Sequence, residues 1–227
     1  MVKSLVLLPV IMLTACASNV KDVGLEKSDF ELYDAAVKIE IQSGNTTISG
    51  SGTWIDDTHV LTASHLWLGV DKGFTLKVIN KKGSHIAKIL NVDNPNYRDL
   101  AVLAVEKNST VKPPLNWQLP ICDRSHVAAE PVWVLSGMYN ILSDTYLSPD
   151  STYSNKGEVG SDGLTGFFKK GVSGSSVLNY RKSCVYGVVS QEDIQEIDVR
   201  KIYKTKITTS GTIRKFLNES GLKTYSS

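Results

Sequence analysis

The chain has 227 residues, of which 41% are hydrophobic and 21% are charged, and its formal net charge is +2. This length and composition fit one compact globular unit with one or two lobes and a sizeable core. Since the net charge is small and no long basic run is present, the sequence gives no indication of a nucleic-acid partner.

The N-terminal residues have the layout of an export signal. Lys3 precedes an apolar stretch over 5–13 that is too short to cross a bilayer as a helix, and the stretch ends in Leu-Thr-Ala-Cys at 13–16. This ending resembles a bacterial lipobox, in which cleavage precedes the cysteine and the thiol of Cys16 is acylated. An ordinary secretory signal with a chance cysteine is the alternative. The prediction is a lipoprotein signal peptide over 1–15 and a polar tether over 16–31.

Acylation of Cys16 would anchor the protein to a membrane through lipid, without a spanning helix. Ala17 follows the cysteine, where an aspartate is associated with retention at the inner membrane. The lipobox resemblance therefore implies a bacterial cell envelope protein, either an outer-membrane lipoprotein or a periplasmic protein.

The next part of the chain alternates between apolar and polar residues, as half-buried β-strands do. Asp56 and Asp57 mark a turn within this region. The expected strands cover 35–41, 47–55, 60–62, 75–79, 85–92 and 100–105. Together they predict a first β lobe over 32–110.

A proline-containing region over 107–120 separates this set from a second one, and the predicted linker covers 111–125. The second set comprises strands at 132–136, near 145–147, near 157–159, and at 176–178, 185–190 and 202–207. Residues 209–211 can cap a terminal helix over 212–220, and Gly221 can end it. The predicted second lobe with its helix spans 126–222.

Three short motifs each place a polar residue of catalytic type beside a β-like apolar run. They are Leu-Thr-Ala-Ser-His at 61–65, Asp-Leu-Ala-Val-Leu at 99–103 and Gly-Val-Ser-Gly-Ser at 171–175. The order His, Asp, Ser is that of the chymotrypsin-type triad, whereas subtilisins and α/β-hydrolases have other orders. On these motifs the chain resembles a trypsin-like (chymotrypsin-fold) serine protease. The resemblance implies an all-β fold of two six-stranded antiparallel β-barrels with a C-terminal helix.

The resemblance also implies a role for each motif. His65 would be the general base, Asp99 would hold the imidazole in the right tautomer, and Ser173 would be the nucleophile. Gly171 permits a backbone conformation that aims N–H groups at a developing oxyanion, so the oxyanion hole would consist of the N–H groups of Gly171 and Ser173.

Each motif has a plainer interpretation as well. His65 could be a core histidine, and Asp93, in the same loop as Asp99, competes for the role of the orienting carboxylate. The segment 171–175 could be a Gly/Ser-rich turn, and Ser175 and Ser176 are poor rivals of Ser173 for the role of nucleophile.

Cysteine usage leaves one pair in the globular part. The chain has three cysteines, and if Cys16 is acylated, Cys122 and Cys184 remain as an even pair in an exported protein. The resemblance implies a disulfide between them, because many trypsin-like enzymes join the corresponding segments of the second barrel. Two free buried thiols are the alternative. Neither cysteine has a partner at CxxC spacing, so no metal site is expected, and the resemblance implies no cofactor.

The segment 186–190 resembles the Gly-Ile-Val-Ser strand that lines the family's substrate cleft. By that match Ser190 would hydrogen-bond Asp99, and Ser190, Gln191 and Glu192 would pair with the substrate backbone as an added strand.

The cleft residues depart from the family's pattern. Gln191 and Glu192 replace the usual aromatic-glycine pair, and Phe167 stands where trypsin-like pockets have their floor, which argues against a pocket for Arg or Lys. Val172 replaces the aspartate that binds a freed N-terminus in many members, so activation by N-terminal cleavage is not expected.

The sequence thus predicts a serine endopeptidase that acts on a protein or peptide substrate through an acyl-enzyme. The altered cleft motivates the alternative, a catalytically silent pseudo-protease of the same fold that serves as a binding module in the envelope.

Overall fold

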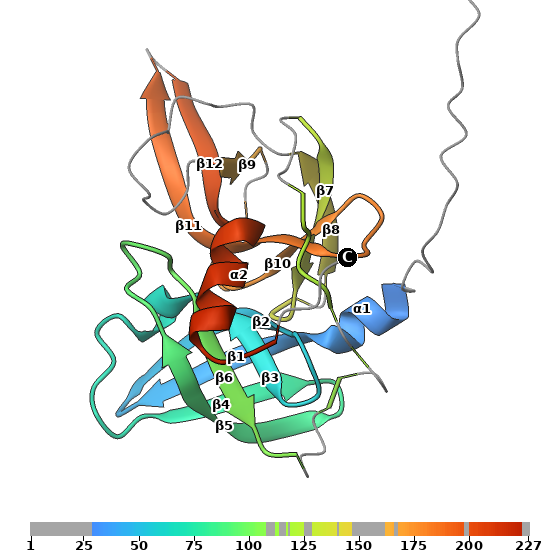
Figure 1. Cartoon of the computed structure of the whole chain (residues 1–227). Helices are drawn as coiled ribbons and strands as arrows, with labels where there is room; N and C mark the ends of the chain where they lie inside the picture. The colour runs from blue at the N-terminus through green and yellow to red at the C-terminus, as the bar shows by residue number, and fades with distance from the viewer. Residues whose placement is uncertain are drawn as a thin grey trace, which may run out of the picture.

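The computed structural model describes residues 29–107, 112–113, 117, 119–124, 129–139, 141–146, 162–165, 168–197 and 200–223 (Figure 1). The predicted signal peptide over 1–15, the predicted acylation site Cys16 and most of the tether lie outside these residues. Within the described part, none of the helices combines the length and apolar character that a bilayer crossing requires.

The first lobe is a closed antiparallel barrel with the strand order β1-β2-β3-β6-β5-β4. Its strands are β1 (Ala36–Ser43), β2 (Thr46–Trp54), β3 (His59–Thr62), β4 (Thr75–Asn80), β5 (Gly83–Val92) and β6 (Ala101–Val105). These bounds agree with the predicted strands to within a few residues. A short 3-10 helix, η1 (Ser64–Trp67), follows β3 and begins beside the histidine of the first motif.

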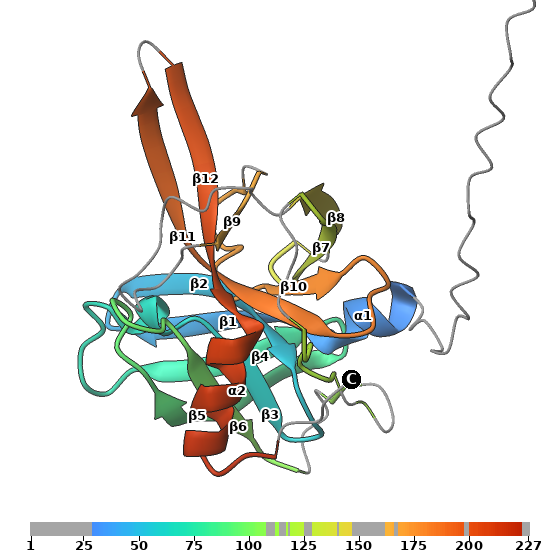
Figure 2. The same ribbon diagram turned by 45° about the horizontal axis from the view of Figure 1, so that its top comes forward.

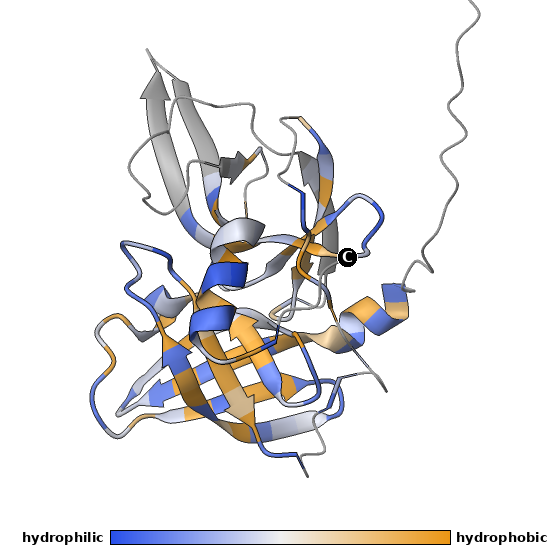
Figure 3. Cartoon of the chain, in the orientation of Figure 1, coloured by the Kyte–Doolittle hydropathy of each residue, from blue (hydrophilic) through white to orange (hydrophobic). Residues whose placement is uncertain are grey.

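Alternation along the strands builds the interior of this barrel. In β1 the side chains of Val37, Ile39 and Ile41 are fully buried, whereas the polar residues between them are partly exposed. Orange apolar bands therefore run along the barrel strands, with hydrophilic blue between them (Figure 3). The period of two that predicted these strands is the direct consequence of one face lying against the core.

The second lobe is a six-stranded antiparallel sheet with the order β8-β7-β10-β11-β12-β9. Its strands are β7 (Pro131–Ser136), β8 (Ile141–Tyr146), β9 (Asp162–Leu164), β10 (Ser176–Asn179), β11 (Val185–Ile197) and β12 (Arg200–Thr209). The predicted two-lobed all-β fold with a C-terminal helix is confirmed, but the second lobe is a half-barrel.

The half-barrel stays open because its end strands do not pair within the described residues. Strand β8 pairs with β7, and β9 has three residues that pair with β12. A barrel closes only when its first and last strands share a ladder. The strand expected near 157–159 lies outside the described residues.

The hairpin of β11 and β12 is longer than the predicted strands and extends away from the rest of the lobe (Figure 2). Its register runs from Gly187↔Thr209 to Ile197↔Arg200, with an irregularity between Val189 and Glu192. The irregularity occurs where β11 leaves the body of the sheet, next to the segment predicted to contact substrate.

Two helices flank the lobes. Helix α2 (Ser210–Glu219) matches the predicted terminal helix and buries Ile213, Phe216 and Leu217, and Gly221 after it has a φ of 73°, as a helix-ending glycine does. Helix α1 (Asp29–Ala35), which was not expected from the sequence, precedes β1.

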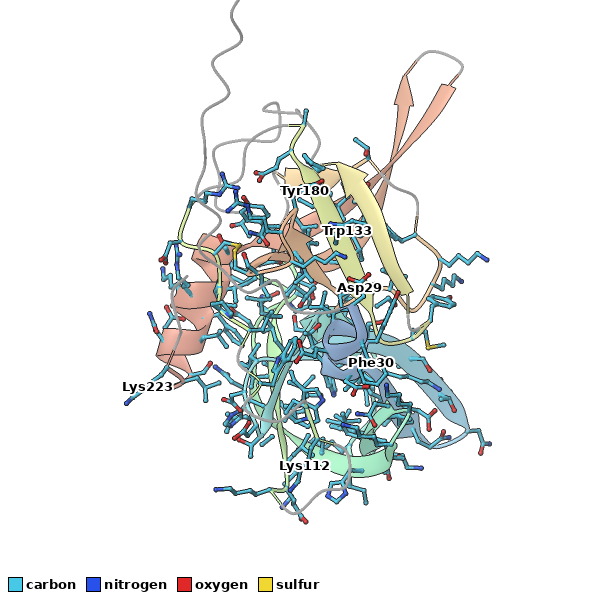
Figure 4. The ribbon with its side chains drawn as sticks, turned by 90° about the vertical axis from the view of Figure 1, so that its right-hand side faces the viewer. Asp29, Phe30, Lys112, Trp133, Tyr180 and Lys223 are labelled. Atoms are coloured by element: carbon cyan, nitrogen blue, oxygen red, sulfur yellow. A yellow bond between two sulfur atoms is a disulfide. The ribbon has the colours of Figure 1, made fainter. Side chains whose placement is uncertain are left out.

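Helix α1 contacts both lobes through charged side chains. Asp34 lies 2.5 Å from the Lys81 ammonium group of the first lobe, and Asp29 pairs with Lys182 of the second. The Lys182 ammonium also lies 4.3 Å from the ring centroid of Trp133. In Figure 4, Asp29 and Trp133 accordingly lie on the same side of the molecule.

The two lobes share one apolar interior. The larger core cluster contains first-lobe residues such as Ile39 and Leu61 together with Leu178 and Val188 of the second sheet. The predicted disulfide between Cys122 and Cys184 is confirmed, and both half-cystines are buried. Because the lobes are packed this closely, side chains at their junction have defined relative positions.

Candidate active site

Asp99 is fully buried at the junction and receives hydrogen bonds from both lobes. Its Oδ1 accepts the main-chain N–H of His65 at 2.7 Å and the Ser64 hydroxyl at 3.1 Å. Its Oδ2 lies 2.8 Å from His65 Nδ1 and accepts the hydroxyl of Ser190. Since an ionised carboxylate only accepts, Nδ1 carries the proton in this pair, and Nε2 of the neutral ring is left as an acceptor.

The loop before β6 holds Asp99 in an unusual conformation, with a φ of 49°. This left-handed region costs most L residues about 1–2 kcal/mol, and aspartate is one of the few residues that enter it, because its short side chain can hydrogen-bond locally. The carbonyl of Asn94 compensates by accepting the N–H groups of Tyr97, Arg98 and Asp99. Backbone strain of this kind is typical of functional sites, where the surrounding structure imposes it.

Arg98, directly before Asp99, ties the loop to the second lobe. Its guanidinium pairs with Asp93 and lies 2.5 Å from Glu219 of α2, and its carbonyl accepts the Thr208 hydroxyl at 2.7 Å. Burial alone would lower the pKa of Arg98, but the hydrogen bonds to Glu219 and Asp93 outweigh it and raise that pKa. Asp93, the rival carboxylate, is therefore a partner of Arg98 in this structure.

Ser173 lies in a tight turn between two glycines in the left-handed region, Gly171 with a φ of 95° and Gly174 with a φ of 85°. The Gly174 N–H donates to the carbonyl of Val189 at 2.8 Å. Among the described residues, no main-chain carbonyl accepts a hydrogen bond from the N–H group of Gly171 or of Ser173. Within the described part of the chain, neither N–H group thus takes part in the backbone hydrogen-bond network.

The backbone of the first lobe contacts the backbone of this turn directly. Ser51 of β2 donates its N–H to the carbonyl of Ser173 at 2.8 Å. A Cβ at Gly174 would lie 2.1 Å from the carbonyl oxygen of Ser51 and 2.3 Å from Oγ1 of Thr62. Glycine is required here because no side chain fits between the lobes.

His65 and Ser173 line the same open cleft, which has a volume of about 250 Å³. Ser175, the rival nucleophile, is fully buried, as is Ser176. Ser173 is therefore the serine of this turn that faces the cleft. The lining residues are His65, Phe168, Lys169, Lys170, Val172, Ser173, Val189, Ser190, Gln191 and Thr205.

Of the predicted substrate-binding residues, Ser190 and Gln191 lie at the cleft. Phe167 lies outside the described residues. Glu192 is in β11, but its side chain also lies outside the described part of the structure.

Several residues at the site were missed by sequence reasoning. Phe168, Lys169 and Lys170 line the cleft, and their position directly before the serine motif was a signal that could have found them. No sequence signal could have found Thr205, because it lies far from the motifs in the chain and reaches the cleft only through the pairing of β12 in the sheet. Ser64 stands where the family's histidine motif has an alanine, and its hydroxyl bonds to Asp99.

The Val172 side chain is buried in the smaller core cluster, beside Val189 and Tyr186. An apolar residue at this place keeps the serine turn attached to the sheet by packing. Among the described residues, no group of three or more His, Cys, Asp or Glu side chains is arranged to hold a metal ion.

No protein-family model matches the sequence, and no curated protein matches it. Solved structures do match. The serine endoprotease from Yersinia pestis aligns with a TM-score of 0.60 and 17% identity, covering 87% of this chain and 68% of that chain.

The Rv3671c protease from M. tuberculosis aligns in its active form with a TM-score of 0.59 and 17% identity, covering 85% of this chain and 83% of that chain. Its inactive mutant form aligns with a TM-score of 0.57 and 17% identity, covering 85% of this chain and 90% of that chain. At such identities the likeness concerns the fold alone: the chain shares with these two proteases the architecture of two antiparallel β lobes and a C-terminal helix.

Proposed function

We propose that this chain is a serine endopeptidase in which His65, Asp99 and Ser173 form the catalytic triad. The observation that supports the proposal most is the double contact of Asp99 with His65, at the backbone N–H and at Nδ1, on a cleft that Ser173 also lines. A buried carboxylate on Nδ1 leaves Nε2 to act as a base toward a hydroxyl group in the cleft.

In the proposed reaction, His65 Nε2 takes the proton of the Ser173 hydroxyl as Oγ attacks the substrate carbonyl carbon. The C–N bond then breaks, the proton passes from His65 to the leaving amine, and an acyl-enzyme remains on Ser173. Water hydrolyses this ester by the same proton transfers. Asp99 stabilises the imidazolium that forms in each half of the cycle.

The N–H groups of Gly171 and Ser173 would bind the substrate oxygen as it becomes negative. A preorganised donor of this kind lowers the barrier by about 2.7–4 kcal/mol. The φ of 95° at Gly171 supports this role, because that conformation is open to glycine and directs backbone N–H groups to one side of the turn.

Substrate would bind as an additional strand along β11. The ladder with β10 ends at Val188, so beyond Val189 the edge of β11 that faces away from β12 has no strand partner among the described residues. Ser190 and Gln191 lie on this edge and at the cleft. Main-chain hydrogen bonds would hold a peptide there, and the cleft would select its side chain.

Fluorophosphonate labelling of the purified full chain, with mass mapping of the adduct, tests the proposal. We expect an adduct on Ser173 in the wild type, none in Ser173→Ala, and labelling at least a hundredfold slower in His65→Ala. His85→Ala is the matched control, since His85 lies on β5 away from the cleft, and it should label like the wild type.

A folded wild-type chain that does not react would overturn the endopeptidase proposal. It would favour the alternative, a pseudo-protease that binds peptides without cleaving them. The fold comparison does not separate the two, because the active and inactive forms of Rv3671c match this chain about equally.

We further propose that Cys16 is acylated and anchors the protease in a bacterial cell envelope, with residues 17–28 between the lipid and α1. Fractionation of cells expressing the full chain tests this. Wild-type protein should partition with the detergent phase, and Cys16→Ser should move to the aqueous phase. Equal partitioning would contradict the anchor.

A further inference from the structure

Two side chains outside the triad bind the backbone on either side of Gly171, one at the peptide unit that carries its N–H and one at the following peptide unit. The Tyr139 hydroxyl donates to the carbonyl of Lys170, directly before Gly171. The Ser51 hydroxyl donates to the carbonyl of Gly171 itself, at 2.8 Å. We propose that Ser51 and Tyr139 are positioning residues that fix the orientation of the Gly171 N–H toward the cleft. This inference rests on the proposed oxyanion role of Gly171.

Tyr139 acts through the geometry of the peptide bond. In a trans peptide the carbonyl of one residue and the N–H of the next point in opposite directions. When Tyr139 binds the Lys170 carbonyl, the Gly171 N–H must therefore point away from Tyr139. A peptide without this bond can rotate, because a glycine restricts its own backbone little.

The three hydrogen-bond partners of the Ser51 hydroxyl allow only one placement of its proton. Its Oγ lies 3.1 Å from Ser136 Oγ, accepts the Met138 N–H at 3.1 Å, and is 2.8 Å from the Gly171 carbonyl. A hydroxyl has one proton and two acceptor sites. Since a carbonyl cannot donate, the proton of Ser51 goes to Gly171, and Ser136 supplies the third bond as donor. Three partners thus fix a fully buried hydroxyl.

The turn that carries Tyr139 is itself anchored to the first lobe. A Cβ at Gly137 would lie 1.9 Å from the carbonyl oxygen of Val37 in β1, so the turn rests directly on that strand. On the other side, a Cβ at Gly171 would lie 2.8 Å from Cγ of Met138. The β7–β8 turn therefore packs between β1 and the serine turn.

Ser51 holds both residues of the proposed oxyanion hole. Its side chain binds the Gly171 carbonyl, and its N–H binds the Ser173 carbonyl at 2.8 Å. One residue of the first lobe thus spans the turn of the second. With Val172 in place of an acidic residue, no ion pair at that position can order the turn, and these neutral hydrogen bonds supply the order.

Nuclear magnetic resonance tests the positioning directly and without activity. Protein labelled with ¹³C-carbonyl lysine and ¹⁵N-glycine gives correlations for Lys-Gly pairs, which occur in this sequence at 72–73, 82–83, 156–157 and 170–171. In Tyr139→Phe the 170–171 correlation should move upfield in ¹³C or broaden, while the other pairs stay in place as internal controls. A 170–171 correlation that does not move would overturn the role of Tyr139.

Ser51→Ala should likewise shift or broaden the 170–171 correlation. Thr53→Val is its matched control, because Thr53 lies on the same strand, is fully buried, and its hydroxyl has no partner among the described residues. Tyr180→Phe, at an exposed tyrosine, is the control for Tyr139→Phe. If the control variants shift the 170–171 correlation as strongly, the shift reports a general loss of packing and not a specific hydrogen bond, and the proposal is overturned.

The rate of phosphonylation at Ser173 gives the functional result. We expect about tenfold slower labelling in Tyr139→Phe and Ser51→Ala, because complete loss of a donor costs about 10²–10³ and these variants misalign one. Both controls should label at the wild-type rate. An unreactive wild type would refute the proposed function while the carbonyl shifts still decide the positioning. If Tyr139→Phe and Ser51→Ala label at the wild-type rate, the positioning role is refuted and the proposed function is not.

Discussion

Asp99 binds His65 twice, with Oδ1 on the main-chain N–H at 2.7 Å and Oδ2 beside the imidazole Nδ1 at 2.8 Å. The two oxygens of one carboxylate thus define both the position of the histidine backbone and the orientation of its ring. Because Asp99 is fully buried, water cannot replace either contact.

This pairing predicts the effect of Asp99→Asn. The amide NH₂ would donate to Nδ1 and leave the proton on Nε2, so the proposed proton transfer from Ser173 to His65 could not take place. We expect kcat to fall by about 10³–10⁴-fold against any peptide substrate that the wild type cleaves. Asp93→Asn tests the rival carboxylate, and a change below tenfold is expected because Asp93 binds Arg98. A larger loss for Asp93→Asn would reverse the assignment.

Gly174→Ala should destabilise the whole molecule. Its Cβ would meet the Ser51 carbonyl and Thr62 at distances that no side chain tolerates, in a left-handed conformation. Overpacking and backbone strain together predict a loss of about 3 kcal/mol or more in the free energy of unfolding, measured by urea denaturation. Gly44→Ala is the matched control, with a φ of 55° and no neighbour within 4 Å, and should lose about 1 kcal/mol. Equal losses would contradict the close approach.

The Cys122–Cys184 disulfide closes a loop with a sequence separation of 62 residues. A loop of that length restricts the unfolded chain by about 4 kcal/mol in the chain-entropy model. The double variant Cys122→Ser, Cys184→Ser should therefore unfold at lower urea concentration, and dithiothreitol should lower the stability of the wild type but not of the variant. An unchanged midpoint would show that the cross-link contributes little.

The raised pKa of Tyr186 predicts that the protein loses stability at high pH. Burial, aided by its hydrogen bonds to the Glu130 carboxylate at 2.9 and 3.0 Å, raises the pKa of Tyr186 to about 12. A tyrosine in the unfolded chain has a pKa near 10. The higher pKa in the folded state therefore contributes to the free energy of unfolding below about pH 10, and this contribution disappears as the pH rises toward 12.

The free energy of unfolding of the wild type should thus fall more steeply between about pH 10 and 12 than that of Tyr186→Phe. Denaturant titrations at several pH values measure both slopes. Tyr180→Phe, at an exposed position, is the control and should keep the wild-type slope. Parallel slopes for Tyr186→Phe and the wild type would contradict the raised pKa.

The strands of the first lobe were predictable because each has one buried face, and a period of two is written into consecutive residues. The second lobe was harder to predict. Strand β9 is three residues long, too short for a periodic pattern, and whether the sheet closes depends on contacts between its end strands.

The sequence by itself indicated the candidate triad, since each member lies in a short motif that needs no distant residue to be noticed. The resemblance carried by these motifs implied the disulfide between Cys122 and Cys184, which the structure contains. Only the tertiary structure brought Ser64 to Asp99, Ser51 to Gly171 and Tyr139 to Lys170, across 35, 120 and 31 residues of chain. A lone serine or tyrosine carries no local pattern. Its role is decided by which buried carbonyl or carboxylate the packing of the two lobes places within reach of its hydroxyl group.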